Sequence, residues 1–314
     1  MKKADYIKDL TTTVYCQHTR SDFARNTDFH IHDCCEVYYL YEGTVTIYVD
    51  GSCYVLKAGD ILLMSDLEIH KILAHSGSVF SRKIVHIYPD YVRPYGTEQT
   101  DLLACFYNHP VGKNNLIHLD YSKQKEYESY FDKLSTGPSD KYGDDISYRI
   151  ALVDFLISIN IWQQSQDNII DPICDERIAP IMDYIEKHLT DSFTLDDIAK
   201  DIYMDKYYMC HMFKKLTGST IFQYIRMKRI ALAKDLLVRG TTVTDTCHMA
   251  GFNDYSNFIR TFKKITGYTP NYFRIPVSKN NESVHRIWYN MYRITNFMKL
   301  CKLRLIDLWK GKYD

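Results

Sequence analysis

Basic side chains recur at matching places in the second half of this chain. Residues 213–218 read Phe-Lys-Lys-Leu-Thr-Gly and residues 262–267 read Phe-Lys-Lys-Ile-Thr-Gly, 49 positions further on. Paired lysines can contact the phosphates of a nucleic acid, which positions a protein without reading the base sequence. Arg260, just before the second lysine pair, could read guanine through two hydrogen bonds to O6 and N7. These residue types therefore indicate binding to a polyanion.

The charge distribution along the chain supports the same interpretation. Residues 1–160 contain 16 Lys and Arg against 22 Asp and Glu, a net charge of −6. Residues 178–314 contain 22 against 13, a net charge of +9, although the whole chain has a formal net charge of zero. An asymmetry of this kind suggests that the basic half meets a polyanion.

The two lysine pairs each end one copy of a repeated helical unit. Thr194 and Thr242 begin the copies, and a carboxylate follows each threonine three positions later, at Asp197 and Asp245. This spacing is typical of a helix N-terminus with a capping box. Each copy reads as a short helix, a tight turn and a second helix that stops at glycine. Such a duplication predicts two helix-turn-helix motifs, whose second helices enter the DNA major groove.

The second copy resembles the AraC/XylS family of transcription regulators. The resemblance is strongest at residues 250–264, Ala-Gly-Phe-Asn-Asp-Tyr-Ser-Asn-Phe-Ile-Arg-Thr-Phe-Lys-Lys, and it continues to Phe273 and Arg274. It implies a non-enzymatic regulator, an activator or a repressor, that binds double-stranded promoter DNA, forms a homodimer and could have RNA polymerase as a further partner. The expected location is cytoplasmic. It also implies that the long helix at 221–238 holds the two recognition helices apart on one face of the DNA.

Helical phase and this resemblance together predict the DNA contacts. The candidates are Lys206, Tyr207, Cys210, His211 and Lys214 in the first recognition helix, and Asp254, Tyr255, Ser256, Asn257, Arg260 and Lys263 in the second. Tyr208 is expected to face inward. The sequence departs from the family at His211, where an arginine is common, and at Thr246 and Cys247, which replace an Ile-Ala pair. Because of these departures, the resemblance does not predict which bases are preferred. It also does not predict how tightly the first helix of the second helix-turn-helix motif packs.

The first part of the chain has a different pattern, with many short strands joined by turns. Residues 36–41 and 44–49 are rich in β-branched and aromatic side chains, and Asp50-Gly51 is a strong hairpin signal. Regular short strands of this kind predict a small barrel or jelly roll. The fold class expected for the whole chain is therefore α+β and multidomain, with a β-barrel followed by an all-helical domain.

The barrel segment resembles the cupins. The matching residues are His30, His32, Glu36 and Gly43 of the first cupin motif, and Gly59, Asp60, Ile61 and His70 of the second. The Pro-Gly of the second motif is absent, and Asp66 and Leu67 stand in its place. The resemblance implies that His30, His32, Glu36 and His70 could hold a divalent transition metal. The alternative is a metal-free barrel in which these side chains line a pocket or form structural hydrogen bonds, with no cofactor.

The barrel interior is the predicted effector site, because the mouth of a small barrel is a common ligand site. The candidate lining residues are His30, His32, Glu36, Tyr38, His70 and His86. The expected effector is a sugar or another small metabolite. Tyrosines in the strands either stack on such a ligand or pack within the sheet.

Changes in residue composition and hydrophobic pattern along the chain predict its domain boundaries. The expected regions are a cupin-like barrel at 1–120, a helical region at 121–162 for dimerisation or packing on the barrel, a linker at 163–177, the DNA-binding domain at 178–276 and a basic amphipathic extension at 277–314. The extension could contact the protein or a partner, DNA phosphates or an anionic membrane.

The remaining features restrict the protein class. The nine cysteines do not show the paired spacing of a metal site, and we expect them to be reduced. The first residues are polar, unlike a secretory signal peptide. No apolar run is long enough to span a membrane. The leading hypothesis is a ligand-responsive, sequence-specific transcription regulator. The alternatives are a metal-dependent cupin enzyme or metal sensor with an appended helical domain, and a constitutive DNA-binding protein with a vestigial barrel.

Overall fold

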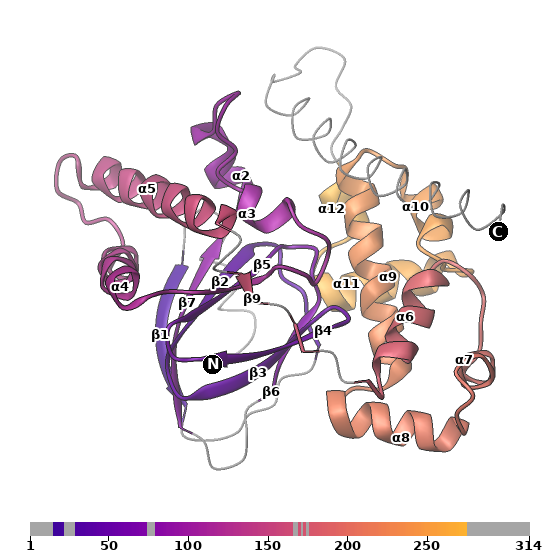
Figure 1. The fold of residues 1–314 in the computed structure, drawn as a ribbon. Coiled ribbons are helices and arrows are strands. Elements are labelled where there is room, and N and C mark those ends of the chain that lie inside the picture. The colour runs from indigo at the N-terminus through magenta and orange to yellow at the C-terminus, as the bar shows by residue number, and fades with distance from the viewer. Residues whose placement is uncertain are drawn as a thin grey trace, which may run out of the picture.

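A computed structural model describes residues 15–21, 29–73, 79–165, 169–170, 172–173 and 176–274. A β-barrel with its covering helices lies beside an all-helical unit (Figure 1). The predicted α+β multidomain architecture is confirmed. The predicted basic extension at 277–314 lies outside the described residues. Within them, no helix combines the length and the apolar character that crossing a lipid bilayer requires.

Two antiparallel sheets form the barrel. The strands are β1 (Tyr15–Ser21), β2 (Cys35–Glu42), β3 (Thr44–Val49), β4 (Ser52–Lys57), β5 (Asp60–Met64), β6 (His70–Leu73), β7 (Phe80–Ile87), β8 (Leu116–His118) and β9 (Ile169–Ile170). The larger sheet has the order β1-β7-β2-β5-β8-β9, and the smaller has the order β4-β3-β6. The predicted hairpin at Asp50-Gly51 joins β3 to β4, and Asp50 has a positive φ of 49°. Because β2 belongs to the larger sheet and β3 to the smaller, the chain passes from one sheet to the other at Gly43.

Alternation along β2 separates two cores. Tyr38 and Leu40 point between the sheets, where they pack with β3 residues such as Ile47. Val37 and Tyr39 point to the opposite face of the larger sheet, toward the helices. This is the period of two expected for a strand that is covered on both faces.

Helices cover the outer face of the larger sheet. They are α2 (Pro89–Val92), the 3-10 helix η1 (Arg93–Tyr95), α3 (Ala104–Tyr107), α4 (Tyr121–Thr136) and α5 (Asp144–Gln164). Phe131 of α4 stacks on Tyr39 with ring centroids 5.0 Å apart, and Phe155 of α5 lies edge-on to Phe131 at 5.5 Å. The helical region predicted at 121–162 thus packs on the barrel.

The other side of α5 is exposed. Four isoleucines project there, namely Ile146, Ile150, Ile157 and Ile161, with 52%, 62%, 36% and 65% of their surface exposed. Among the described residues, the wide apolar circumference of this helix is therefore covered on one side only.

The linker predicted at 163–177 is in part built into the barrel. Residues 163 and 164 belong to α5, and β9 pairs with β8 as an edge strand of the larger sheet. The backbone N–H of Ile173 donates to the carbonyl of Cys53 at 2.7 Å. The polar composition predicted an interdomain linker, and short apolar stretches within this segment pair with strands that are distant in sequence.

The helical unit contains the predicted duplication. Its helices are α6 (Ala179–Lys187), α7 (Leu195–Asp201), α8 (Lys206–Thr217), α9 (Ile221–Val238), α10 (Val243–Met249), α11 (Tyr255–Thr266) and α12 (Pro270–Phe273). Thr194 and Asp197 form a complete capping box at α7, and the Thr242 side chain caps α10. Gly218 and Gly267 end α8 and α11 in the left-handed conformation, with φ of 68° and 84°.

The long helix α9 belongs to both halves of this unit. Ile221 and Tyr224, near its start, pack in one apolar cluster with α6, α7 and α8. Ile230 and Leu237, further along, pack in a second cluster with α10 and α11. The helix therefore fixes the distance between α8 and α11.

Candidate functional site

The predicted DNA contacts lie at the surface of the helical unit, with three qualifications. On α8, Tyr207, His211 and Lys214 are exposed, and on α11, Tyr255, Ser256, Asn257, Arg260 and Lys263 are exposed. Lys206 is half-buried and pairs with Asp196 at 2.8 Å, and Cys210 is half-buried against the apolar cluster. The Asp254 carboxylate caps α11 by accepting from the N–H of Asn257. These three side chains thus have structural contacts of their own.

Tyr208 differs from its expected position, because 57% of its surface is exposed. Asp205 caps α8 and places Tyr208 in the first turn. In that first turn Tyr208 lies outside the apolar cluster, which Met209 enters at the next position. Tyr208 therefore belongs to the exposed face of the recognition helix.

Arg229 of α9 joins the two helix-turn-helix units. Its guanidinium donates to the carbonyl oxygens of Leu189 at 2.9 Å and Asp191 at 2.8 Å, which precede α7. It also donates to the carbonyl of Gly251, in the turn between α10 and α11, at 2.7 Å. A planar group with donors on several edges suits this role, because it binds acceptors in fixed directions.

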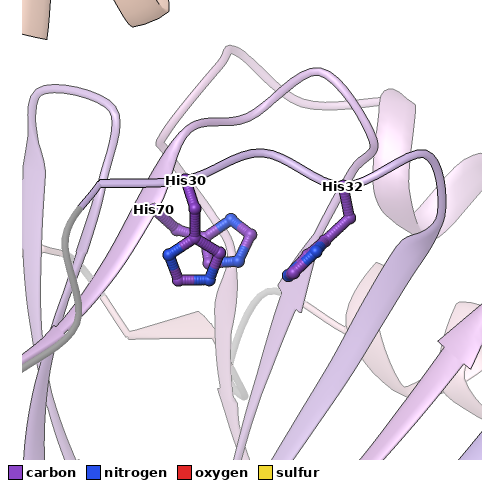
Figure 2. Close-up of side chains that lie close together, drawn as sticks. All are labelled: His30, His32 and His70. Carbon is purple, nitrogen blue, oxygen red and sulfur yellow. The ribbon is translucent and has the colours of Figure 1, made fainter. Parts of the chain in front are cut away.

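In the barrel, four histidines surround the buried carboxylate of Glu36. Glu36 Oε2 lies 3.2 Å from His32 Nε2, 3.1 Å from His86 Nε2 and 3.8 Å from His70 Nε2. The His30 ring completes the group, with its centroid 4.4 Å from that of His70 and 4.9 Å from that of His32. Figure 2 shows these three rings facing one another at one end of the barrel. We call His30, His32, Glu36, His70 and His86 the histidine cluster.

The electrostatics of the cluster favour a neutral imidazole beside an ionised carboxylate. Burial and the neighbouring His30 and His32 rings hold the pKa of His70 well below its ordinary value. Burial alone would raise the pKa of Glu36, but hydrogen bonds from His32 and His86 hold it well below its ordinary value. His70 Nδ1 lies 3.0 Å from the carbonyl of Glu68, to which it donates, so the lone pair of Nε2 faces the cluster.

This arrangement can bind a polar ligand or a metal ion. Two groups of side chains have candidate ligand atoms within 4.8 Å of one another, His30, His32 and His70 in one, and His32, Glu36 and His86 in the other. Imidazole nitrogens with one carboxylate suit Zn²⁺ and related transition metals. Among the described residues, His70 Nε2 is a buried nitrogen without a hydrogen bond, as an available ligand atom would be. The donor set therefore fits such an ion.

Five of the six residues that the sequence offered as effector candidates lie together in the structure. His30, His32, Glu36, His70 and His86 converge, although they come from the three strands β2, β6 and β7 and from the segment that precedes β2. Tyr38, the sixth candidate, is fully buried in the core between the sheets. It shares a face of β2 with Glu36, which is why the alternation suggested it.

Comparison with known proteins identifies both units. A model of the AraC-like ligand binding domain matches residues 14–125, and a helix-turn-helix domain model matches residues 198–275. The Transposon Tn10 TetD protein of Escherichia coli is 35% identical over 98 residues, which are 31% of this chain and 71% of that protein. This chain belongs to the AraC family of transcription regulators.

Other AraC-family relatives match over most of the chain. The arabinose operon regulatory protein of Salmonella typhimurium is 26% identical over 232 residues, covering 72% of this chain and 78% of that protein. The uncharacterized HTH-type transcriptional regulator YbfI of Bacillus subtilis is 24% identical over 239 residues, covering 73% and 80%. The chain is therefore an AraC-family regulator with a ligand-binding domain and a DNA-binding domain.

Two lysines of this AraC-family chain have contacts that the sequence reasoning missed. Lys228 and Lys234 point from α9 toward the end of the barrel and are buried, with 7% and 2% of their surface exposed. Lys228 pairs with Asp50 in the β3–β4 turn and with Glu186 of α6. Helical phase could have predicted the burial of Lys234. This lysine lies three residues beyond Ala231 and next to Ala233, on the apolar side of the helix.

Proposed function

We propose that this protein binds a specific promoter sequence through α8 and α11, and that a small effector held by the histidine cluster changes that binding. The observation that supports this most directly is the position of the cluster. It is a concentrated set of polar groups at the end of the barrel that contacts the helical unit. A ligand there can change DNA binding if its affinity differs between two arrangements of the protein.

The helical unit presents two recognition helices at a separation that suits two successive major grooves of DNA. The 18 residues of α9 span about 27 Å. This length approaches the roughly 34 Å between successive major grooves on one face of DNA. Lys214 and Lys263, exposed at equivalent positions of α8 and α11, are suited to phosphate contacts. Arg260 is suited to reading a guanine.

The first candidate effector is a sugar or another small polar metabolite. Imidazole nitrogens and a carboxylate can hydrogen-bond the hydroxyl groups of such a ligand. The relative named as an arabinose operon regulatory protein gives independent support, because its similarity extends through both domains. A metabolite would insert between His30, His32 and Glu36 and replace some of their mutual contacts.

The second candidate effector is a divalent transition metal. The specific observation in its favour is that two sets of three ligand atoms lie within coordination range of one another. His32 belongs to both sets and would be a ligand in either case. The full-length relatives reported above are transcription regulators, which favours a metal as a signal over a metal as a catalyst.

We further propose that two copies of the chain associate through α5. Its exposed isoleucines recur at intervals of four and seven residues, the spacing of a helix that packs against another helix. A homodimer would bury this stripe and would bring two helical units to one operator, where RNA polymerase is the further partner we expect.

The proposal can be tested with the purified full-length chain. Binding sites are first selected from genomic DNA fragments, and affinity for the selected site is then measured with and without sugars and with Zn²⁺, Mn²⁺ or Ni²⁺. We expect sequence-dependent binding that one of these ligand classes changes. Equal affinity for all sequences at moderate salt would contradict the promoter-binding proposal. A site-specific protein that no sugar, metabolite or metal affects would instead support a constitutive DNA-binding protein.

A further inference from the structure

Two segments of the barrel border both the histidine cluster and the helical unit. Residues 29–33 and 66–71 lie antiparallel, and His30 and His70 exchange two backbone hydrogen bonds of 3.0 Å. We call these two segments the shared wall. Side chains on opposite sides of an extended segment alternate, so neighbouring residues can serve different sites. In the shared wall this alternation separates ligand-binding residues from docking residues.

The side of the wall away from the histidines packs on the helical unit. Phe29 and Ile69 are buried in the same apolar cluster as residues of α6, α8 and α9. The Phe29 ring meets that of Tyr224 edge-on at 5.3 Å. On the other side of the same segments lie His30, His32 and His70. A shift of the wall toward a ligand would therefore also change its fit to the helical unit.

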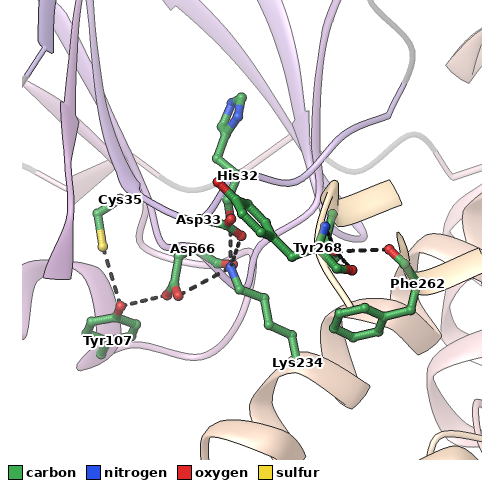
Figure 3. A network of polar contacts seen from close by, with 9 residues as sticks. His32, Asp33, Cys35, Asp66, Tyr107, Lys234, Phe262 and Tyr268 are labelled. Carbon is green, nitrogen blue, oxygen red and sulfur yellow. Dashed lines mark hydrogen bonds and ion pairs between the residues drawn. The ribbon is translucent and has the colours of Figure 1, made fainter. Parts of the chain in front are cut away.

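Lys234 makes the most direct polar contact between α9 and the wall. Its ammonium donates to the carbonyl oxygens of His32 at 2.7 Å and Asp66 at 2.9 Å. It also pairs with the carboxylates of Asp33 at 3.2 Å and Asp66 at 3.4 Å. Figure 3 shows the side chain reaching from its helix to these oxygens. A buried ammonium needs such partners, because an unpaired charge in the protein interior is strongly destabilising.

His32 connects the two sites within one residue. Its side chain contacts Glu36 in the cluster at 3.2 Å, while its carbonyl accepts from Lys234. Building on the function proposed above, we infer that the shared wall transmits the state of the histidine cluster to the DNA-binding unit, with Lys234 as the contact that senses it. A ligand that reorients His32 displaces the His32 carbonyl and Asp33 together, which changes how well α9 docks.

Lys228 supplies a matched comparison. It lies on the same helix and is also buried, but its carboxylate partners are Asp50, in the β3–β4 turn, and Glu186, in α6. Neither carboxylate belongs to the shared wall, which Asp50 contacts only through its backbone N–H, a donor to the Ile69 carbonyl at 2.8 Å. Replacing Lys228 should therefore weaken docking without disconnecting the cluster, whereas replacing Lys234 should do both.

The first test is a double-mutant cycle on DNA affinity. Glu36→Gln perturbs the cluster from β2, outside the wall, and is combined with Lys234→Met or Lys228→Met. We expect Glu36→Gln to change the dissociation constant for the selected site about fivefold or more in the wild type, the lower end of typical coupling between linked sites. The change should vanish in the Lys234→Met background and persist in the Lys228→Met background. An equal change with and without Lys234, or no change in the wild type, would overturn the inference.

The second test does not require DNA. The His30 and His70 amides each donate to the carbonyl oxygen of the other residue. Hydrogen exchange at these two amides is followed in both lysine variants after circular dichroism has shown that each variant is folded. Lys234→Met should accelerate this exchange, and Lys228→Met should leave it close to the wild-type rate. Equal exchange in the two variants would refute coupling through the wall. If no variant binds DNA but this difference is seen, the promoter-binding proposal fails and the coupling stands.

Discussion

The carbonyl oxygen of His32 accepts a hydrogen bond from Lys234 across 202 positions of sequence, at 2.7 Å. The side chain of the same histidine lies 3.2 Å from Glu36 inside the barrel. One residue thus belongs to the candidate effector site and to the contact between the domains. This double role has a physical basis in the extended backbone, which directs a side chain and a carbonyl group in different directions.

Arg260 should set base preference on α11. Arg260→Ala is expected to cost about 1–3 kcal/mol of binding and to relax preference at one base pair. Lys263→Ala is the comparison, because loss of a phosphate contact should weaken all sequences alike and lower the slope of affinity against salt by about one. Affinities for a set of single-base operator variants measure both effects. Uniform loss over that set with Arg260→Ala would contradict the base-reading role.

Arg229 should fix the spacing of the two recognition helices. Arg229→Lys keeps the charge but cannot reach Leu189, Asp191 and Gly251 together, so the two motifs should move more freely. We expect affinity for the full operator to fall about tenfold, equivalent to about 1.4 kcal/mol. Operators with altered half-site spacing should lose less. Arg226→Lys, at an exposed position of the same helix, is the control and should behave as the wild type.

Thr246 should be a site where the protein can be stabilised. Its hydroxyl is buried in α10 and has no hydrogen-bond partner among the described residues. Thr246→Val removes this unsatisfied group at nearly constant volume and should raise the free energy of unfolding by about 1 kcal/mol. Thr217 is the opposite case, because its buried hydroxyl donates to Phe213 and accepts from Ser219. Thr217→Val should therefore destabilise, and urea denaturation of both variants checks the two signs.

The isoleucine stripe of α5 should hold two copies of the chain together. Ile150→Glu would place a carboxylate in that interface, where an unpaired buried charge costs several kcal/mol. Sedimentation equilibrium should then show dissociation to monomers at concentrations where the wild type is dimeric. Tyr142→Glu, in the exposed loop before α5, is the control and should leave the oligomeric state unchanged. A wild type that is monomeric at high concentration would rule out this interface.

His32 should be required for any metal bound by the barrel, because both candidate ligand groups contain it. If Zn²⁺, Mn²⁺ or Ni²⁺ is the effector, elemental analysis should find a stoichiometric amount in the wild type and a loss in His32→Ala. His118→Ala is the matched control, since His118 pairs with Asp60 outside the cluster. Equal metal content in the two variants would place the ion elsewhere. A wild type without bound metal would favour the metabolite.

The sequence by itself determined the elements and their chemistry. The recurrence of capping threonines and terminal glycines fixed two helix-turn-helix motifs, because such signals act between residues a few positions apart. Spacing within the first cupin motif, together with His70 and His86, identified the residues of the histidine cluster. Phase along α8 differed from the structure at Tyr208, in the first turn, where position relative to the cap decides exposure, and at Cys210, which is half-buried against the apolar cluster.

Only the tertiary structure shows that the segments carrying the histidine cluster also contact the helical unit. Lys234, Asp33 and Asp66 form one contact although they are separated in sequence by up to 201 positions, and no local period relates them. The same holds for β9, which adds to the barrel from within the expected linker. Such contacts depend on how two folded surfaces match in shape and charge, and neighbouring residues in the sequence do not encode that match.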